Sequence, residues 1–183
     1  KLHGMNKKIY VTLNTVFEDR EAPQIYNLLK YLSLVKPDAI IVQDTGIINM
    51  CSKFFPEINI HASTQANISS AEGLNFLSRY NVKRVVLSRE LDLTQIKQIK
   101  ANSSAEIEIF AHGALCVCTS GLCLFSSYFG GKSANRGRCT QACRRYYSNG
   151  TGDKAGYYFS LNDLMLIKYI PDIIGAGVNS IKI

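Results

Sequence analysis

The stretch Ala39-Ile-Ile-Val-Gln-Asp44 decides how the chain folds. It follows a break at Pro37-Asp38, begins with an apolar, β-branched run and ends on two polar residues, which is the pattern of a short strand. Similar runs recur along the chain, and each is separated from the next by a segment with helical periodicity. This alternation predicts βα units arranged around a parallel sheet.

The pattern predicts six strands, all parallel, over residues 8–14, 39–44, 58–63, 84–88, 106–110 and 180–183. The segments between them predict helices over residues 19–35, 47–55, 71–80, 93–101 and 160–174, the last interrupted by Pro171. Ser69 or Ser70 can cap the third helix. No glycine-rich turn follows the first strand, so a Rossmann unit is disfavoured.

These elements are typical of an α/β fold of the (β/α)8, or TIM-barrel, type. We expect one domain over residues 1–183, a partial barrel that lacks its first two strands and carries a cysteine-rich insertion at about residues 113–157. The open sheet edges of a partial barrel require cover from another segment or a partner chain. Barrel enzymes carry their active sites on the loops that follow the strands, so the insertion belongs to the functional face.

Composition bears on where the protein works. Hydrophobic residues make up 46% of the chain, but no apolar run approaches the roughly 20 residues that cross a bilayer. No signal-peptide pattern is visible either. We therefore expect a cytoplasmic protein with no membrane partner, and in a reducing cytosol six cysteines favour metal binding or catalysis over a disulfide framework.

The formal net charge of +7 is unevenly distributed, because residues 109–152 contain no Asp or Glu. Basic and aromatic side chains alternate in the same stretch, which suits phosphate contact and base stacking. RNA is therefore one predicted partner, and a solvated basic loop is the alternative. The residues concerned are Lys132, Arg136, Arg138, Arg144 and Arg145 with Phe125, Tyr128, Phe129, Tyr146 and Tyr147.

Five of the six cysteines lie between Cys116 and Cys143, in the spacings Cys116-x6-Cys123 and Cys139-x3-Cys143. Zinc sites usually use tighter Cys-x2-Cys pairs. The longer spacings favour an iron-sulfur cluster, with zinc, disulfides or free thiols as alternatives. Cys118 is interpreted as a bystander and Cys51 as a core residue.

Several polar residues at predicted strand ends are candidates for chemistry. His112 and His61 can transfer protons near neutral pH, and with Glu90 they are the predicted catalytic residues. His112 could also serve as the base for a Cys116 nucleophile. The residues predicted to bind substrate are Arg136, Arg138, Arg144, Lys132, Asn135, Gln65 and Asp44.

Two segments carry a family resemblance. One is Glu108-Ile-Phe110-Ala-His-Gly113-Ala114-Leu115-Cys116, continued after four residues by Gly121-Leu-Cys123-Leu-Phe125-Ser126. The other is Asn135-Arg136-Gly137-Arg138-Cys139. Together they resemble the collagenase-like peptidase family, peptidase family U32, with Phe125 at a position where the family pattern has an aliphatic residue.

The resemblance implies a barrel-like catalytic domain. Some members resemble oxygen-independent hydroxylases of transfer RNA, ribosomal RNA or ubiquinone precursors, with a 4Fe-4S cluster and, in some, prephenate as hydroxyl donor. It also implies that the cluster ligands are Cys116, Cys123, Cys139 and Cys143.

The predicted function is hydroxylation of a tRNA wobble uridine or an rRNA cytidine. Two alternatives stay open: a collagenase-like protease acting on a peptide substrate, and a non-catalytic RNA-binding protein with a structural cluster.

Overall fold

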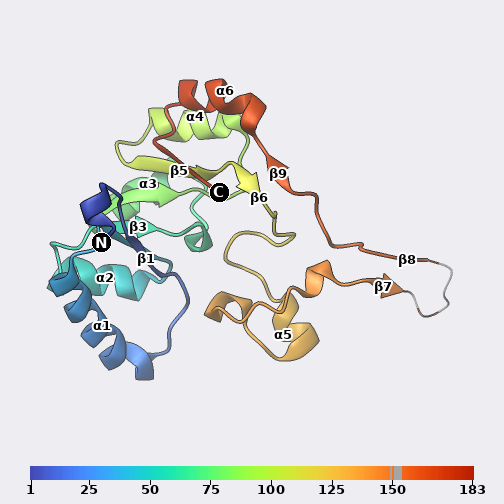
Figure 1. Cartoon of the computed structure of the whole chain (residues 1–183), viewed down its shortest axis with the longest axis horizontal. Helices are drawn as coiled ribbons and strands as arrows, with labels where there is room; N and C mark the ends of the chain where they lie inside the picture. Colours follow the sequence, from blue (N-terminus) through green and yellow to red (C-terminus); the bar gives the residue numbers. More distant parts are fainter. Residues whose placement is uncertain (149, 151–153) are drawn as a thin grey trace.

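A computed structural model describes residues 1–148, 150 and 154–183, and its main feature is a six-stranded parallel sheet curled into a half-barrel (Figure 1). The strand order is β1-β2-β3-β4-β5-β10, and every neighbouring pair is parallel. The six predicted strands are therefore confirmed. Their bounds are β1 (Tyr10–Leu13), β2 (Ala39–Val42), β3 (Ile60–Ala62), β4 (Val82–Val86), β5 (Glu106–Phe110) and β10 (Ser180–Lys182).

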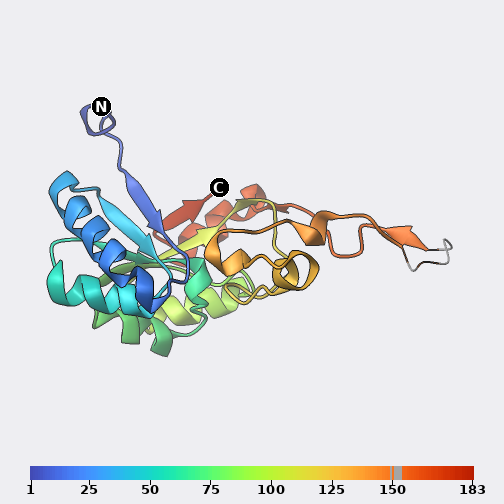
Figure 2. The same cartoon turned by 90° about the horizontal axis from the view of Figure 1, so that it is seen from below.

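Helices follow the strands and cover one face of the sheet (Figure 2). They are α1 (Ala22–Val35), α2 (Thr45–Phe54), α3 (Ala71–Ser78), α4 (Leu93–Ala101) and α6 (Ile170–Gly175). Ser70 caps α3 as predicted, since its Oγ accepts the Gly73 amide at 3.1 Å. No helix in the described part of the chain is long and apolar enough to cross a membrane.

The hydrophobic core lies between these helices and the sheet. Leu29 of α1, Ile48 of α2 and Leu74 of α3 meet strand residues such as Val85 and Ile107, and all are nearly inaccessible to solvent. Cys51 is fully buried in this core, as expected for a small apolar side chain, and burial raises the pKa of its thiol to about 12. The core therefore fixes the strands whose carboxyl ends carry the polar residues.

The chain leaves the sheet after β5 and returns to it only at β10. The segment between β5 and α6 is mostly irregular and lies beside the sheet, with β7 and β8 farthest from it (Figures 1 and 2). It contains two small antiparallel pairs, β6 with β9 and β7 with β8. Its elements are β6 (His112–Gly113), α5 (Phe125–Gly130), β7 (Tyr147–Ser148), β8 (Ala155–Gly156) and β9 (Leu164–Met165).

The predicted helix over residues 160–174 is wrong in its first half. Leu164 and Met165 instead form β9, which pairs with His112 and Gly113 of β6, and the Leu166 amide bonds the Ala111 carbonyl at 2.9 Å. A pairing between segments far apart in sequence thus overrides the local helical pattern. Helix α6 begins only at Ile170, where Pro171 occupies its first turn and needs no intrahelical donor.

A charged layer crosses the sheet face opposite the helices. Side chains alternate along a strand, so Arg84 and Glu108 lie on the other face from Val85 and Ile107. Arg84 Nε donates to Glu106 Oε2 at 2.8 Å, and its Nη1 donates to Glu108 Oε2 at 3.1 Å. Lys182 Nζ lies 3.0 Å from Glu108 Oε1. Ion pairs therefore link β4, β5 and β10 in addition to the backbone hydrogen bonds of the sheet.

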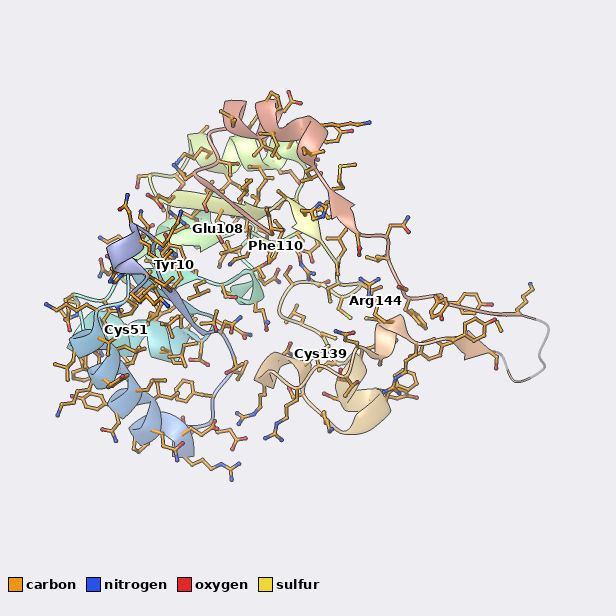
Figure 3. All side chains as sticks on the ribbon, viewed as in Figure 1. Tyr10, Cys51, Glu108, Phe110, Cys139 and Arg144 are labelled. Atoms are coloured by element: carbon orange, nitrogen blue, oxygen red, sulfur yellow. The ribbon has the colours of Figure 1, made fainter. Side chains whose placement is uncertain are left out.

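Burial alone would raise the pKa of Glu108, but the hydrogen bond and charge of Lys182, with Arg84, hold it below the usual value. Tyr10 and His61 continue this layer toward β1, with their rings 4.9 Å apart. Figure 3 labels Tyr10 on β1 and Glu108 on β5. Because this pKa is lowered, Glu108 stays ionised and the layer stays paired at neutral pH.

Replacing Arg84 by methionine is expected to lower the free energy of unfolding by about 2 kcal/mol or more, since it leaves the buried Glu108 carboxylate with Lys182 as its one remaining basic partner among the described residues. Arg20→Met is the matched control, because the Arg20 side chain is 80% exposed in its pair with Glu18. That control should change the stability by less than about 1 kcal/mol. Chemical unfolding of both variants makes the comparison, and equal effects would contradict a stabilising role for the layer.

Candidate metal and substrate site

A cavity of about 220 Å³ opens where β3, β4 and β5 end and the cysteine segment begins. Loops after these strands supply Gln65, Arg89 and His112, and the irregular segment supplies the rest of the wall. None of its described lining residues is acidic. The lining comprises Thr64, Gln65, Arg89, Phe110, His112, Gly113, Ala114, Leu115, Cys116, Thr119, Gly121, Cys123, Ala134, Asn135, Cys139 and Leu164.

Three of the four predicted ligands, Cys116, Cys123 and Cys139, line this cavity together. The fourth, Cys143, lies near them: burial raises the pKa of its thiol, and Cys116 and Cys139 are further causes. Burial likewise raises the pKa of Cys118 to about 11, with contributions from Cys123, Cys116 and Cys143. The chain therefore gathers five free thiols at one end of the sheet, whereas Cys51 lies in α2, away from Cys139 (Figure 3).

The thiols are gathered but do not converge on one point. Among the described residues, no three His, Cys, Asp or Glu side chains are close enough to hold a metal ion. The Cys139 sulfur accepts a hydrogen bond from the Gln141 amide at 3.4 Å, and its Sγ lies 4.0 Å from the buried Ser126 hydroxyl. This exposed sulfur thus has two neighbouring donors of the kind that stabilise a thiolate.

Ser120 ties the loop of residues 116–123, the cysteine loop, to the end of β4. Its amide donates to Glu90 Oε1 at 2.8 Å, and its hydroxyl lies 3.2 Å from both Glu90 oxygens. Arg89 Nε donates to the same hydroxyl at 3.3 Å, and its Nη2 donates to the Cys118 carbonyl at 3.3 Å. Ser120 is fully inaccessible to solvent, whereas Arg89 is half-buried and Glu90 is exposed, so the clamp joins a buried hydroxyl to charged groups at the surface.

The clamp changes the interpretation of Glu90, for which the sequence predicts a catalytic role. In the structure both of its carboxylate oxygens hold Ser120. Arg89 and Ser120 were not singled out by sequence reasoning, although the charged pair Arg89-Glu90 directly after a strand is a visible signal. Arg89 also lines the cavity, so it connects the clamp to the site.

Gly121 allows the cysteine loop to approach the loop after β3. Its φ is +76°, and a Cβ atom there would lie 1.9 Å from the Gln65 carbonyl oxygen. A larger residue would be strained in conformation and would clash with backbone. Glycine is therefore required for Cys123 and Gln65 to share one cavity.

The predicted substrate-binding residues and the two predicted catalytic histidines fall into three groups, and the first group lies in or beside the cavity. Gln65 and Asn135 line the cavity, as does the predicted catalytic His112. Lys132 and Arg138 lie in a shallow depression that they share with Cys139 and Thr140. Cys139 lines both hollows, so the depression adjoins the cavity.

Arg136 and Arg144 form the second group, because their guanidinium groups bind the protein itself. Arg136 makes a two-pronged pair with Glu21, at 3.0 and 2.9 Å, which holds the pKa of that carboxyl down at about 2. Arg144 donates to the carbonyls of Leu115 and Leu161 at 2.7 and 2.6 Å and to the Ser160 hydroxyl at 2.7 Å. Both arginines therefore join distant segments of the chain.

The third group contains residues away from the cavity. Asp44 caps α2, since its Oδ1 accepts the Gly46 and Ile47 amides at 2.7 and 3.2 Å. His61 is not among the cavity residues and is only 6% exposed. Burial, with the nearby Arg84 charge, lowers its pKa to about 4, so it is neutral near pH 7.

The chain matches one protein family over its whole length and resembles several curated proteins. The sequence profile of Peptidase family U32 matches residues 1–183. The 23S rRNA 5-hydroxycytidine C2501 synthase of Escherichia coli is 42% identical over 99% of this chain and 28% of its own length. The tRNA hydroxylation protein P of Escherichia coli is 35% identical over 99% of this chain and 41% of its own length.

A collagenase of Porphyromonas gingivalis is 35% identical over 96% of this chain and 46% of its own length. The chain thus spans less than half the length of these curated relatives. The solved structure of a U32 peptidase superposes on 61% of this chain and 49% of its own with a TM-score of 0.54 at 12% identity. That likeness supports the fold.

Removing the clamp is expected to loosen the cysteine loop. Ser120→Ala leaves Glu90 with the Ser120 backbone amide as its partner in the loop, a loss that we expect to cost about 1 kcal/mol of local stability, because water can solvate the exposed carboxylate. Hydrogen exchange of amides 116–123 should become faster in this variant. Ser127→Ala is the control, because Ser127 is exposed and makes one long bond of 3.4 Å to the Lys132 carbonyl. Equal exchange in the two variants would show that the clamp does not order the loop.

Proposed function

The chain belongs to Peptidase family U32, and on that premise we propose that it is part of an enzyme that hydroxylates a pyrimidine nucleoside of RNA. The observation that carries the proposal is the cavity at the strand ends, where three cysteines lie beside His112, Arg89 and two carboxamides, with no acidic group among its described lining residues. The names of two relatives, an rRNA 5-hydroxycytidine synthase and a tRNA hydroxylation protein, support the substrate class. The proposed targets are an rRNA cytidine or a tRNA wobble uridine.

The proposed cofactor is a 4Fe-4S cluster held by Cys116, Cys123, Cys139 and Cys143. A zinc ion needs its sulfur ligands at about 2.3 Å from one centre, which places neighbouring sulfurs roughly 4 Å apart. A cluster spreads its ligands over several iron atoms, and this suits the long spacings Cys116-x6-Cys123 and Cys139-x3-Cys143, three of whose thiols share the cavity. The cluster would supply electron-transfer chemistry, and the Gln141 amide at Cys139 is a donor of the kind that tunes such sulfurs.

The remaining cavity residues have roles that follow from their chemistry. Gln65 and Asn135 carry both a donor and an acceptor, so their carboxamides can hydrogen-bond the edge of a pyrimidine. Arg89 is held by Ser120 and would offer positive charge to an anionic group of the substrate. His112 is the residue best suited to move a proton, since it lines the cavity and is exposed.

Hydroxylation replaces a C–H bond by C–OH and is a two-electron oxidation, so it requires an oxygen source and an electron acceptor. In the oxygen-independent reaction proposed, prephenate is the candidate hydroxyl donor and would leave as phenylpyruvate and CO2, while the two electrons released from the C–H bond would pass to an external redox carrier. The reducing cytoplasm, where free thiols and RNA occur together, is the proposed location.

The proposed architecture of the whole catalytic domain is a closed (β/α)8 barrel. Its support is the curled parallel sheet, in which β1 and β10 each pair with one neighbour among the described strands. Two further strands would pair with these edges, from another segment or from a partner chain. The cysteine-rich insertion at about residues 113–157 would then lie at the mouth of the barrel, where such folds carry their active sites.

Proteolysis is the second candidate function, and the collagenase among the relatives is what favours it. A cysteine peptidase requires a base hydrogen-bonded to its nucleophile. His112 and Cys116 both line the cavity, but no hydrogen bond joins them in the described structure. The hydroxylase therefore accounts for more of the site than the protease does.

Nucleoside mass spectrometry of a strain lacking the gene should show the loss of one pyrimidine nucleoside that is heavier than its parent by one oxygen atom. The wild-type gene should restore it and Cys139→Ser should not, because the thiolate ligand is lost. Cys51→Ser serves as the control, since Cys51 lies in the core away from the cavity. An unchanged nucleoside profile in the deletion strain would contradict the hydroxylase proposal. Hydrolysis of gelatin by the purified protein, if abolished by Cys116→Ala, would support the protease.

A further inference from the structure

An aromatic arm projects from the body of the molecule and takes no part in the cavity. We define the aromatic arm as residues 145–148 and 154–159, which include β7 and β8 (Figures 1 and 2). It is joined to α5 by a closed set of ring contacts with centroid distances of 5.1 to 5.9 Å. The four rings are Phe125, Phe129, Tyr147 and Phe159. The arm thus has an apolar anchor of its own.

A second group of rings faces solvent. Tyr146 and Tyr157 are each 62% exposed and form an edge-on pair with centroids 5.2 Å apart. Tyr158 is 60% exposed, and Tyr128 within α5 is 85% exposed. Four exposed tyrosines on the aromatic arm and the adjoining α5 are unusual on a surface that contacts only water, because each ring would gain by burial against a flat partner.

The charge beside these rings identifies the partner. Lys132, Arg138, Arg145 and Lys154 are exposed, and no described acidic side chain forms an ion pair with them. Arg136 and Arg144 differ, because their guanidinium groups bind Glu21 and backbone carbonyls. Basic groups left to solvent beside exposed rings are complementary to a phosphate backbone with accessible bases.

We infer that the aromatic arm is a platform for unpaired RNA, on which Tyr146 and Tyr157 stack bases while Arg145 and Lys154 bind phosphates. This inference rests on the proposed function for the choice of RNA. The depression with Lys132 and Arg138 adjoins the cavity through Cys139, so it extends the basic surface to the site. Stacking needs bases that are free of a partner strand, so the platform selects loops or single strands over duplex.

Fluorescence anisotropy of the full-length protein with a labelled single-stranded oligoribonucleotide tests the platform. Tyr146→Ala with Tyr157→Ala should weaken binding about tenfold or more, because base–aromatic stacking is lost. Tyr146→Phe with Tyr157→Phe should bind like wild type, since the rings remain. Arg145→Gln should reduce the slope of log affinity against log salt by about 0.7. Tyr31→Ala on α1 is the matched control at 61% exposure and should bind normally.

Three outcomes would overturn the inference. The double alanine variant could bind the oligoribonucleotide as tightly as wild type does, or wild type could bind the single strand and its duplex equally. The double alanine variant could also lose self-association while it keeps RNA binding. Sedimentation of the same variants measures the last. The binding assay requires neither a bound iron-sulfur cluster nor hydroxylation of the RNA, so it is independent of the nucleoside experiment. If the double alanine variant hydroxylates normally and binds RNA as well as wild type does, the platform alone is rejected. If RNA binding depends on the aromatic arm but no hydroxylated nucleoside is found, the hydroxylase alone is rejected.

Discussion

The contact between the buried Ser120 and the Arg89-Glu90 pair is the constraint on which the site depends. The chain leaves the sheet after β5 and returns only at β10, so an irregular segment must be held against the strand ends. A fully buried hydroxyl that meets a carboxylate and a guanidinium does this at little cost, because each polar group is satisfied. Gly121 then permits the close approach that brings the cysteine loop onto the loop after β3.

Positive charge is divided between structure and surface. Arg84 and Lys182 neutralise the buried Glu108 across three strands, and Arg136 and Arg144 join segments far apart in sequence. The remaining basic groups of the irregular segment face solvent beside exposed rings. The same excess of charge therefore has two physical uses, and only contacts in the folded chain distinguish them.

The six strands were predictable because each is a short β-branched run between clear breaks. The first half of the helix over residues 160–174 was not, because β9 is made by pairing with β6, about fifty residues earlier in the sequence. Grouping of the cysteines was visible from their nearness in sequence. The roles of Asp44 and Glu90 were not, because a carboxylate at a strand end can equally cap a helix, hold a loop or meet a substrate.

The central claim is that the thiols gathered above the strand ends hold an iron-sulfur cluster. Anaerobic purification followed by iron and acid-labile sulfide assay tests it most directly. The account predicts about four of each per protein, a strong loss in Cys116→Ser, Cys123→Ser, Cys139→Ser and Cys143→Ser, and no loss in Cys51→Ser, whose thiol lies in the core. Protein that binds zinc alone, or iron that survives all four substitutions, would contradict it.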